Sequence, residues 1–451
     1  MNNSLHILAL AYVYPPDSGS GTFRPLYFMN NLAKRGVSVS VITVRTEDFH
    51  VDASVDTALV NKIHPDIKVI RCSVKRPMDA LIDIKNKIFN PDKASNRQSV
   101  NLVKPIHKKK RPTPAGVIDY FSDIISGVLT CPDHHVGWIP DVLKKARHLI
   151  KQEKTDYIYA TGGPWSCVLA GALLHKISGL PLILDFRDPW ISNPNFFKKP
   201  PFLRYLEKKM EAFVINSAKA VIANTNELRA DFLNRYSCLN EKNTHTITNG
   251  FEKIEHPVAH QKNKYFSLVH AGELYMSRNP ANLLKAIEEL IKEGKINNDL
   301  FRIKFVGGIS INDLKLNELL RSQYLENVIE LYPRVSHSEA LLFQQGADVL
   351  LLIQPDFPLQ IPRKLFEYIS LQKTVLAITE ACSATGNIIR SKHLGVVVEN
   401  SMYAIKTAVL EMYQLWEKNQ LLPLNIDEVS EFSNEVLAGK LEKIIREIVG
   451  K

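Results

Sequence analysis

Short runs of Val, Ile, Leu and Ala recur along most of this chain, separated by segments in which apolar residues have helical spacing. Apolar runs without polar alternation are typical of strands buried on both faces, and helices between such strands imply parallel pairing. One series of these runs covers residues 5–250, and a second starts near residue 266. The pattern predicts an α/β protein with two Rossmann-like, doubly wound domains.

The expected elements follow directly from this alternation. In the first series we expect helices near 23–34, from Trp165 and around 202–216, with strands at 5–13, 37–44, 156–161, 180–186, 218–224 and 244–250. In the second series the expected strands are 266–272, 301–307, 328–332, 348–353, 374–378 and 395–399. Ser336 and Glu339 have the spacing of a capping box, which predicts a helix start.

The chain has 451 residues, more than one hydrophobic core usually supports. We expect an N-terminal domain over 1–255, with an irregular basic insertion at about 75–135, and a C-terminal domain over 264–425. Residues 252–264 are polar and aperiodic, as in a linker, and a helix in 426–451 is expected to pack back toward the N-terminal domain. Ligands of such sheets bind beyond the carboxyl ends of the strands, so we expect the site in a cleft that the two domains face.

Charge and cysteine content limit the partners and the compartment. The formal net charge of +10 calls for an anionic partner: nucleic acid, an acidic membrane surface or a phosphorylated small molecule. The densest basic segment, 93–111, contains no aromatic residue for stacking on bases, which disfavours nucleic acid, and a solvated loop explains it equally well. Its main cations are Lys104, Lys108, Lys109, Lys110 and Arg111.

The five cysteines lie far apart and form no Cys-x-x-Cys pair, which favours a reducing compartment. Residues 5–14 lack a preceding positive charge and are followed by two prolines, so they resemble a buried strand and not a signal peptide. Residues 157–174 are uncharged, but Gly162-Gly163-Pro164 interrupts them, as in a strand, loop and helix. We therefore expect a cytoplasmic protein.

Glycines follow the first expected strand, in the sequence YPPDSGSG at 14–21. Gly19 and Gly21 precede a helix N-terminus, where free N–H groups favour an anion, although a tight turn without a ligand also fits. Arg24 occupies the third glycine position of a Gly-x-Gly-x-x-Gly fingerprint. An NAD-dependent dehydrogenase is therefore a distant alternative, since residues 40–44 also lack the acidic ribose ligand and Glu47 lies beyond them.

Two segments of the second series place cations next to strand ends. In HAGELYMSRNPANLLKAI (270–287) a strand ends at Gly272 and a short loop carries Arg278, beside the point where a phosphate would lie. In IPRKLFEYISLQKTVLAI (361–378) Lys364 and Glu367 share one face at the start of a helix. A surface ion pair would explain Lys364 and Glu367 equally well.

These two segments, with ITNGF (247–251), LDFRDPW (184–190) and the glycine loop at 14–21, resemble the GT-B glycosyltransferases of family four. The resemblance covers most of the chain, except about 75–130. It implies an enzyme whose C-terminal domain binds a nucleotide-diphosphate sugar and whose N-terminal domain binds the acceptor, with retention of the anomeric configuration.

The resemblance also assigns binding roles. Arg278 and Lys364 match the basic residues that hold the donor diphosphate, the leaving group, where preplaced cations stabilise the transition state. Glu367 matches the glutamate that binds the nucleotide ribose. The other assigned positions are the glycine loop (Gly19 and Gly21), the strand end beside the phosphates (Gly272) and the loop beside the base (Pro333, Arg334 and Val335).

Two positions depart from the family pattern. Leu359 replaces a glutamate that helps to hold the donor sugar, so sugar recognition must differ or be lost. Glu273 occupies the position of an arginine, which leaves Arg278 alone in its loop and places more of the phosphate binding on Lys364.

On the acceptor side, the strand ending in LDFRDPW is expected to deliver Asp185, Arg187 and Asp188 to the rim of the cleft. Arg187 and Asp188 stand where many relatives have a His-Asp pair. Asp188 is a candidate to orient the acceptor hydroxyl or accept its proton, whereas a structural salt bridge is an equally good interpretation of Arg187. Gly162 and Gly163 form a further strand-end loop suited to close approach.

Metal chemistry has little support in the sequence. There is no Asp-x-Asp motif, and neither His134-His135 nor His256 with His260 comes with the further ligands of a metal site. We expect no metal and no cofactor apart from the nucleotide-sugar donor.

The predicted function is transfer of a sugar to a hydroxyl of a saccharide or lipid-linked saccharide in surface polysaccharide synthesis. The basic segment 93–111 suggests that the acceptor lies at an anionic membrane face, as a lipid-linked saccharide would, with the enzyme bound peripherally at the inner face of the plasma membrane. The alternatives are a nucleotide-sugar-binding partner subunit without catalysis and a nucleotide-sugar epimerase with the same fold. The sequence indicates neither the donor sugar and base nor the oligomeric state.

Overall fold

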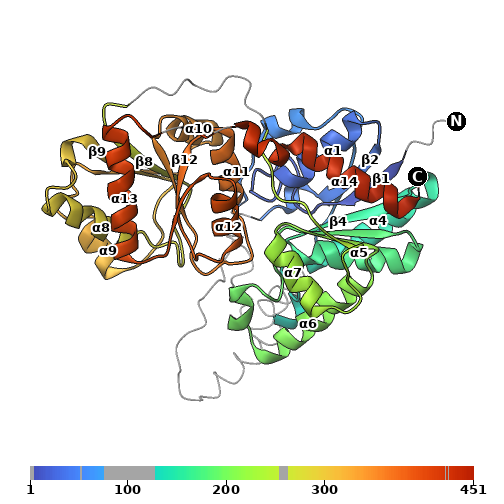
Figure 1. Cartoon of the computed structure of the whole chain (residues 1–451). Coiled ribbons are helices and arrows are strands. Elements are labelled where there is room, and N and C mark those ends of the chain that lie inside the picture. Colours follow the sequence, from blue (N-terminus) through green and yellow to red (C-terminus); the bar gives the residue numbers. More distant parts are fainter. Residues whose placement is uncertain are drawn as a thin grey trace, which may run out of the picture. The chain divides into compact units, whose positions relative to one another are not determined.

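The computed structural model describes residues 5–50, 53–75, 127–252, 263–421, 423–424 and 426–450. The chain divides into two compact units, Met1–Val221 with Glu447–Lys451, and Ile222–Arg446 (Figure 1). The predicted basic insertion and linker fall largely outside the described residues. The predicted domain boundaries remain predictions.

A seven-stranded sheet, with the order β3-β2-β1-β4-β5-β6-β7, begins in the first unit. Its strands are β1 (His6–Leu10), β2 (Ser38–Val44), β3 (Lys68–Cys72), β4 (Tyr157–Gly162), β5 (Leu182–Phe186), β6 (Ala220–Ala223) and β7 (Thr244–Thr246). The central strand β1 pairs in parallel with β2 and β4, and all five of its residues are buried. The strand order and the parallel pairing are those of a doubly wound fold, as predicted.

Helices connect these strands. They are α1 (Phe23–Lys34), α4 (Ile139–Gln152), α5 (Trp165–Ser178), α6 (Pro201–Asn216) and α7 (Asn226–Arg235). Gly36 adopts a φ of +81° just after α1, which confirms the predicted helix end. The expectation missed β3, because its residues Lys68–Cys72 are mostly half-buried and lack the long apolar run of the central strands.

The second unit contains a six-stranded sheet in the order β10-β9-β8-β11-β12-β13. The strands are β8 (Phe266–Ala271), β9 (Phe301–Val306), β10 (Ile329–Tyr332), β11 (Val349–Ile353), β12 (Thr374–Ile378) and β13 (Gly395–Val398). All pairs in this sheet are parallel. Each strand lies within its expected range.

Helices cover both faces of this second sheet (Figure 1). One core packs α8 (Ala281–Lys292), α9 (Leu314–Leu319) and α13 (Met402–Glu417) against the sheet. The other packs α11 (Arg363–Ser370), α12 (Ala384–Ser391), the 3-10 segment Ile426–Phe432 and partly buried residues of α10 (His337–Gln345). Ser336 caps α10 with the predicted capping box, and α14 (Asn434–Val449) is the predicted terminal helix.

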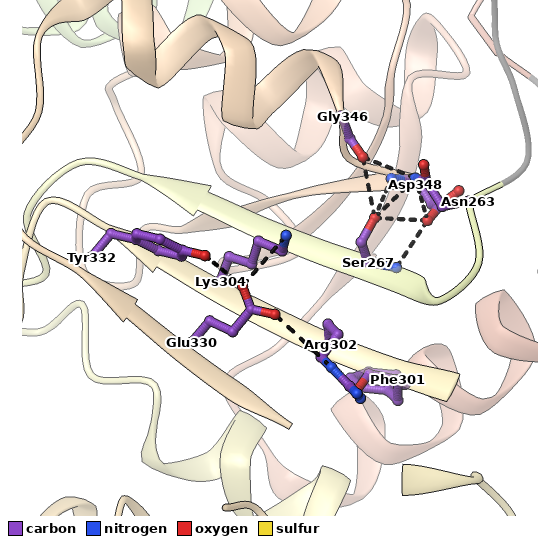
Figure 2. Close-up of polar contacts among 9 residues, drawn as sticks. All are labelled: Asn263, Ser267, Phe301, Arg302, Lys304, Glu330, Tyr332, Gly346 and Asp348. Carbon is purple, nitrogen blue, oxygen red and sulfur yellow. Dashed lines mark hydrogen bonds and ion pairs between the residues drawn. The ribbon is translucent and has the colours of Figure 1, made fainter. Parts of the chain in front are cut away.

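Buried polar contacts fasten the amino ends of β8 and β11 (Figure 2). The hydroxyl of Ser267 donates to the Asp348 carboxylate at 2.7 Å, and the amide of Asn263 donates to the same oxygen at 3.0 Å. On the edge pair, Lys304 of β9 forms an ion pair with Glu330 of β10 at 3.4 Å. The Ser267 backbone N–H donates to the same Asp348 oxygen at 2.9 Å, so these contacts hold the amino ends of β8 and β11 together.

Candidate functional site

At the carboxyl end of β8, a lysine side chain lies against the backbone of a glycine. Gly272 has a φ of +120°, which L side chains rarely adopt, and a Cβ placed there would lie 2.1 Å from Nζ of Lys364. Only a glycine lets this ammonium come so close to the main chain. The structure thus brings together two predicted site residues that are far apart in sequence.

Lys364 reaches this position because α11 starts at the right place. Pro362 is the N-cap residue of α11, so Lys364 falls in its first turn, where backbone N–H groups have no partner within the helix. The preceding loop is anchored by Gln354 and Thr385, whose side chains donate to the Gln360 carbonyl at 3.1 and 3.0 Å. The start of α11 is therefore fixed relative to β11 and α12.

Arg278 adds a second positive charge near Lys364. Its guanidinium lies over the Tyr275 ring, 4.6 Å from the centroid, which holds the cation in place. Burial and then the Arg278 charge lower the pKa of Lys364 to about 8, while Glu367 opposes that shift. Two cations thus converge near one glycine backbone, as sites for phosphate groups do.

Sequence reasoning assigned no role to His270, although it lies in the motif that was singled out. His270 is fully buried, and its Nε2 atom lies 3.5 Å from Nζ of Lys364. Burial and then the Lys364 charge hold the pKa of His270 well below its ordinary value, so the imidazole is neutral. No signal in a single sequence separates such a histidine from an ordinary core residue.

The carboxyl end of the adjacent strand β9 is also followed by glycines, which have no side chain. Gly307 and Gly308 follow β9 with φ values of +125° and +87°, and a Cβ on Gly307 would lie 2.7 Å from the Gly272 carbonyl carbon. At Gly308 a Cβ would meet no atom within 4 Å. Backbone therefore lines this edge beside Lys364. In the sequence, the pair Gly307-Gly308 directly after an expected strand is the signal that indicates this close approach of backbone.

The other predicted residues of the second unit lie close by, with partners of their own. Glu367 forms an ion pair with Arg363 one turn earlier on α11. Glu273, which occupies the position of a family arginine, accepts a hydrogen bond from Ser310. Arg334 is exposed and Val335 is half-buried, in the loop between β10 and α10.

In the first unit, the strand that ends at Phe186 presents a buried ion pair. Arg24 donates to both carboxylate oxygens of Asp185, with a shortest distance of 2.7 Å. Tyr159 and Thr161 also donate to Asp185, at 2.5 and 3.0 Å. Burial alone would raise the pKa of Asp185, but Arg24 and these donors hold it below its ordinary value.

Asp185 does not reach the surface, contrary to the expectation that it lies at a rim, because its side chain is fully buried in this network. Arg24, which breaks the dinucleotide fingerprint, is its partner and not a ligand of a cofactor. Arg24 therefore stands at the third glycine position of the fingerprint because it neutralises a buried carboxylate of the first sheet.

Arg187 connects two glycine loops. Its Nε donates to the Gly162 carbonyl at 2.8 Å, and its Nη1 donates to the Gly21 carbonyl. A Cβ on Gly21 would lie 2.2 Å from Nη1 of Arg187, so this glycine makes room for a side chain of the same protein. Gly19 donates its N–H to Asp17 at 2.7 Å. Arg187 therefore shapes the loops at the ends of β1 and β4.

Asp188 follows Arg187 and is half-buried. A Cβ on Gly163 would lie 3.7 Å from Oδ2 of Asp188, so the carboxylate borders the glycine loop after β4. Burial raises the pKa of Asp188, and the charges of Arg187 and Arg24 oppose that shift. A carboxylate with a raised pKa is a better proton acceptor than an ordinary one.

Among the residues that the structure describes, no group of three or more His, Cys, Asp or Glu side chains has metal-site geometry. His135 contacts the Tyr12 ring, with centroids 4.2 Å apart. The basic segment 93–111, His256 and His260 lie outside the described residues.

Residues 107–253 match the family described as Glycosyltransferase Family 4. Over these residues the chain is similar to glycosyltransferases, and as a whole it has the GT-B fold. No curated protein matches the chain in sequence.

Three solved structures illustrate that fold. A glycosyltransferase from Rickettsia africae ESF-5 superposes with a TM-score of 0.63 at 15% identity, over 99% of each chain. Sucrose-phosphate synthase from Thermosynechococcus elongatus superposes with a TM-score of 0.61 at 12% identity, over 99% of each chain. WaaG, a glycosyltransferase involved in lipopolysaccharide biosynthesis, has a TM-score of 0.56 at 14% identity, over 97% of this chain and 99% of its own.

Removing Arg24 is expected to destabilise the first unit strongly. In Arg24→Met the Asp185 carboxylate stays buried without its cation, which costs about 3–5 kcal/mol of unfolding free energy. Arg24→Lys keeps the charge and is expected to lose less. Urea unfolding at several pH values measures this.

The pH dependence has a defined sign. Because the folded-state pKa of Asp185 is lowered, the stabilisation by Arg24 is complete above the unfolded pKa of about 3.9 and is lost as pH falls through the folded value. Equal stability of wild type and Arg24→Met at neutral pH would contradict the importance of this pair.

Proposed function

We propose that this glycosyltransferase transfers a sugar from a nucleotide-diphosphate donor to a hydroxyl of a saccharide or lipid-linked saccharide. The observation that carries the proposal is the Lys364 ammonium held against the Gly272 backbone, with the Arg278 charge beside it. An unhindered backbone and two cations suit a diphosphate. The resemblance to family four supports retention of the anomeric configuration and a role in surface polysaccharide synthesis.

The same residues suggest how the leaving group is stabilised. Breaking the bond between sugar and phosphate leaves negative charge on the diphosphate, so cations fixed beforehand stabilise the transition state more than the ground state. Lys364 also lies in the first turn of α11, where the helix dipole adds positive potential. We propose that these groups neutralise the diphosphate without a divalent metal.

Roles for the remaining residues follow from their positions. Glu367, once released from Arg363, would accept hydrogen bonds from the ribose, and Arg334 and Val335 would lie beside the base. In the first unit Asp188 would orient the acceptor hydroxyl or accept its proton, while Arg187 positions the loops of Gly21 and Gly162. Leu359 would alter sugar recognition relative to the family, and Glu273 would leave more of the phosphate binding to Lys364.

Donor binding tests the proposal directly. Nucleotide sugars are screened by thermal shift, since a ligand at 100 times its Kd adds about 2.7 kcal/mol to a folded state that binds it. The donor identified in this way is then titrated in the presence of EDTA. Lys364→Met is expected to weaken donor binding about 10- to 100-fold, which is the value of a hydrogen bond to a charged group.

Because the pKa of Lys364 is about 8, wild-type affinity should fall as pH rises above 8, by about tenfold per pH unit, and Lys364→Met should lose this dependence. Lys373→Met is the matched control, because burial also lowers the pKa of that lysine, but its charge faces Asp348 at the opposite edge. Unchanged affinity in Lys364→Met, or binding that requires a metal, would refute this donor site.

A second test concerns Asp188 and the acceptor. Asp188→Asn is expected to lower kcat for transfer by about 100-fold, within the range for a positioned acid or base, while donor affinity stays unchanged. Product formation with acceptor present separates transfer from a binding subunit without catalysis, and donor turnover without acceptor would indicate an epimerase. Full activity of Asp188→Asn would remove the assigned role.

We also propose that the enzyme binds peripherally at an anionic membrane. Within the described residues no helix combines the length and apolar character that a membrane span needs. The surface of α6 exposes Tyr205 at 62%, with Lys208 and Lys209 one turn further along and Nζ of Lys209 5.5 Å from the Tyr205 ring centroid. The 3-10 turn before α6 exposes Phe197 at 63% next to Lys198. Aromatic rings flanked by lysines fit a surface of anionic lipid headgroups.

Vesicle sedimentation tests this surface. Binding to vesicles that contain phosphatidylglycerol is expected to decrease as salt is raised, and to decrease about tenfold or more in a Lys208→Glu, Lys209→Glu double variant. The estimate uses about 1 kcal/mol per basic residue. The control is a Lys242→Glu, Lys315→Glu double variant, which changes two exposed lysines elsewhere on the surface. Binding that is absent or insensitive to salt would exclude this mode of attachment.

A further inference from the structure

We propose that His270 is a positioning residue for the donor site, which accepts a hydrogen bond from the Lys364 ammonium and holds it against the Gly272 backbone. The inference rests on the proposed function, because it assumes that Lys364 binds the donor diphosphate. It adds a buried residue on β8 that would not itself contact the donor.

The tautomer of His270 follows from its partners. Its Nδ1 atom lies 3.0 Å from the carbonyl oxygen of Leu351 on the adjacent strand β11. A carbonyl only accepts hydrogen bonds, so in this contact Nδ1 carries the proton, and Nε2 of the neutral ring then has a lone pair. That lone pair lies 3.5 Å from Nζ of Lys364, which has only donors to offer. The Gly272 backbone also interacts with the ring.

The charges around the ring keep it neutral. Both charged groups that act on His270, Lys364 and Arg278, are positive, and the ring is fully buried. The groups that act on Lys364 are Arg278 and Glu367. A second proton on His270 would point an N–H at an ammonium in a buried place, which is strongly unfavourable.

The contact has a physical consequence for Lys364. A lysine side chain has four rotatable bonds, and an acceptor behind Nζ removes much of that freedom before the donor arrives. The neutral acceptor also favours the charged form of the amine, in which it binds a diphosphate. Loss of the acceptor should therefore weaken donor binding and move the loss of binding at high pH to lower pH.

Titrations with UDP and GDP across pH 6–10 test the inference. His270→Phe keeps the ring shape but offers no acceptor, and His270→Asn keeps a donor toward Leu351 but does not reach Lys364. Both are expected to weaken binding about tenfold, the value of a hydrogen bond to a charged group, and to shift the alkaline decline to lower pH. His270→Gln places an amide near the position of Nε2 and is expected to restore much of the affinity.

Tyr368→Phe is the matched control. The Tyr368 hydroxyl donates to the same Leu351 carbonyl at 3.2 Å, so its removal disturbs the middle of β11 without removing the partner of Lys364. Wild-type affinity and pH profile are expected for Tyr368→Phe, and circular dichroism verifies that each variant is folded.

The outcomes separate the two proposals. The role of His270 alone would be overturned if Lys364→Met abolishes nucleotide binding while His270→Phe keeps both the wild-type affinity and the wild-type pH profile. Equal losses in His270→Phe and Tyr368→Phe would reduce His270 to a structural residue. Failure of the wild type to bind either nucleotide, or any other nucleoside diphosphate, would overturn the proposed function and this inference with it.

Discussion

The Lys364 ammonium lies against the α-carbon of Gly272, and the proposed donor site of the second unit depends on that contact. The contact requires a glycine with positive φ at the end of β8 and a helix that starts at Arg363, and we propose that it also requires His270 as a neutral acceptor. Gly272 and His270 belong to one segment and Arg363 to another, and the parallel sheet brings the two segments to one edge. The anchored loop from Gln354 to Gln360 keeps the helix start in register with the strands.

The first unit uses charge differently. Its main buried ion pair, Arg24 with Asp185, is fully satisfied and stabilises the carboxyl ends of the central strands, while Arg187 is bound to two carbonyl groups. The charges of Arg24, Asp185 and Arg187 thus stabilise the strand ends and loops of this unit. The half-buried loops that result, with Asp188 beside Gly163, are shaped by the protein itself, which suits a unit whose proposed partner is a neutral sugar hydroxyl.

The fold was largely predictable because buried parallel strands leave continuous apolar runs, as in Val349–Ile353 and Thr374–Ile378. β3 escaped prediction because an edge strand that is only half-buried needs no such run. In the site, Gly272, Arg278 and Lys364 could be selected from motifs. The role of His270 could not, since it depends on a ring orientation set by the Leu351 carbonyl on another strand. Likewise Gly21 predicted a close approach, but not that Arg187 makes it.

The central claim is that two protein cations hold the diphosphate of the donor. The most direct measurement compares the affinity for a nucleoside diphosphate with that for its parent nucleoside, in wild type and in a variant with both Arg278 and Lys364 replaced by Met. We predict that the wild type prefers the diphosphate by at least about a hundredfold, the value of two charged hydrogen bonds, and that the preference disappears in the double variant. A preference that survives both replacements would contradict the account.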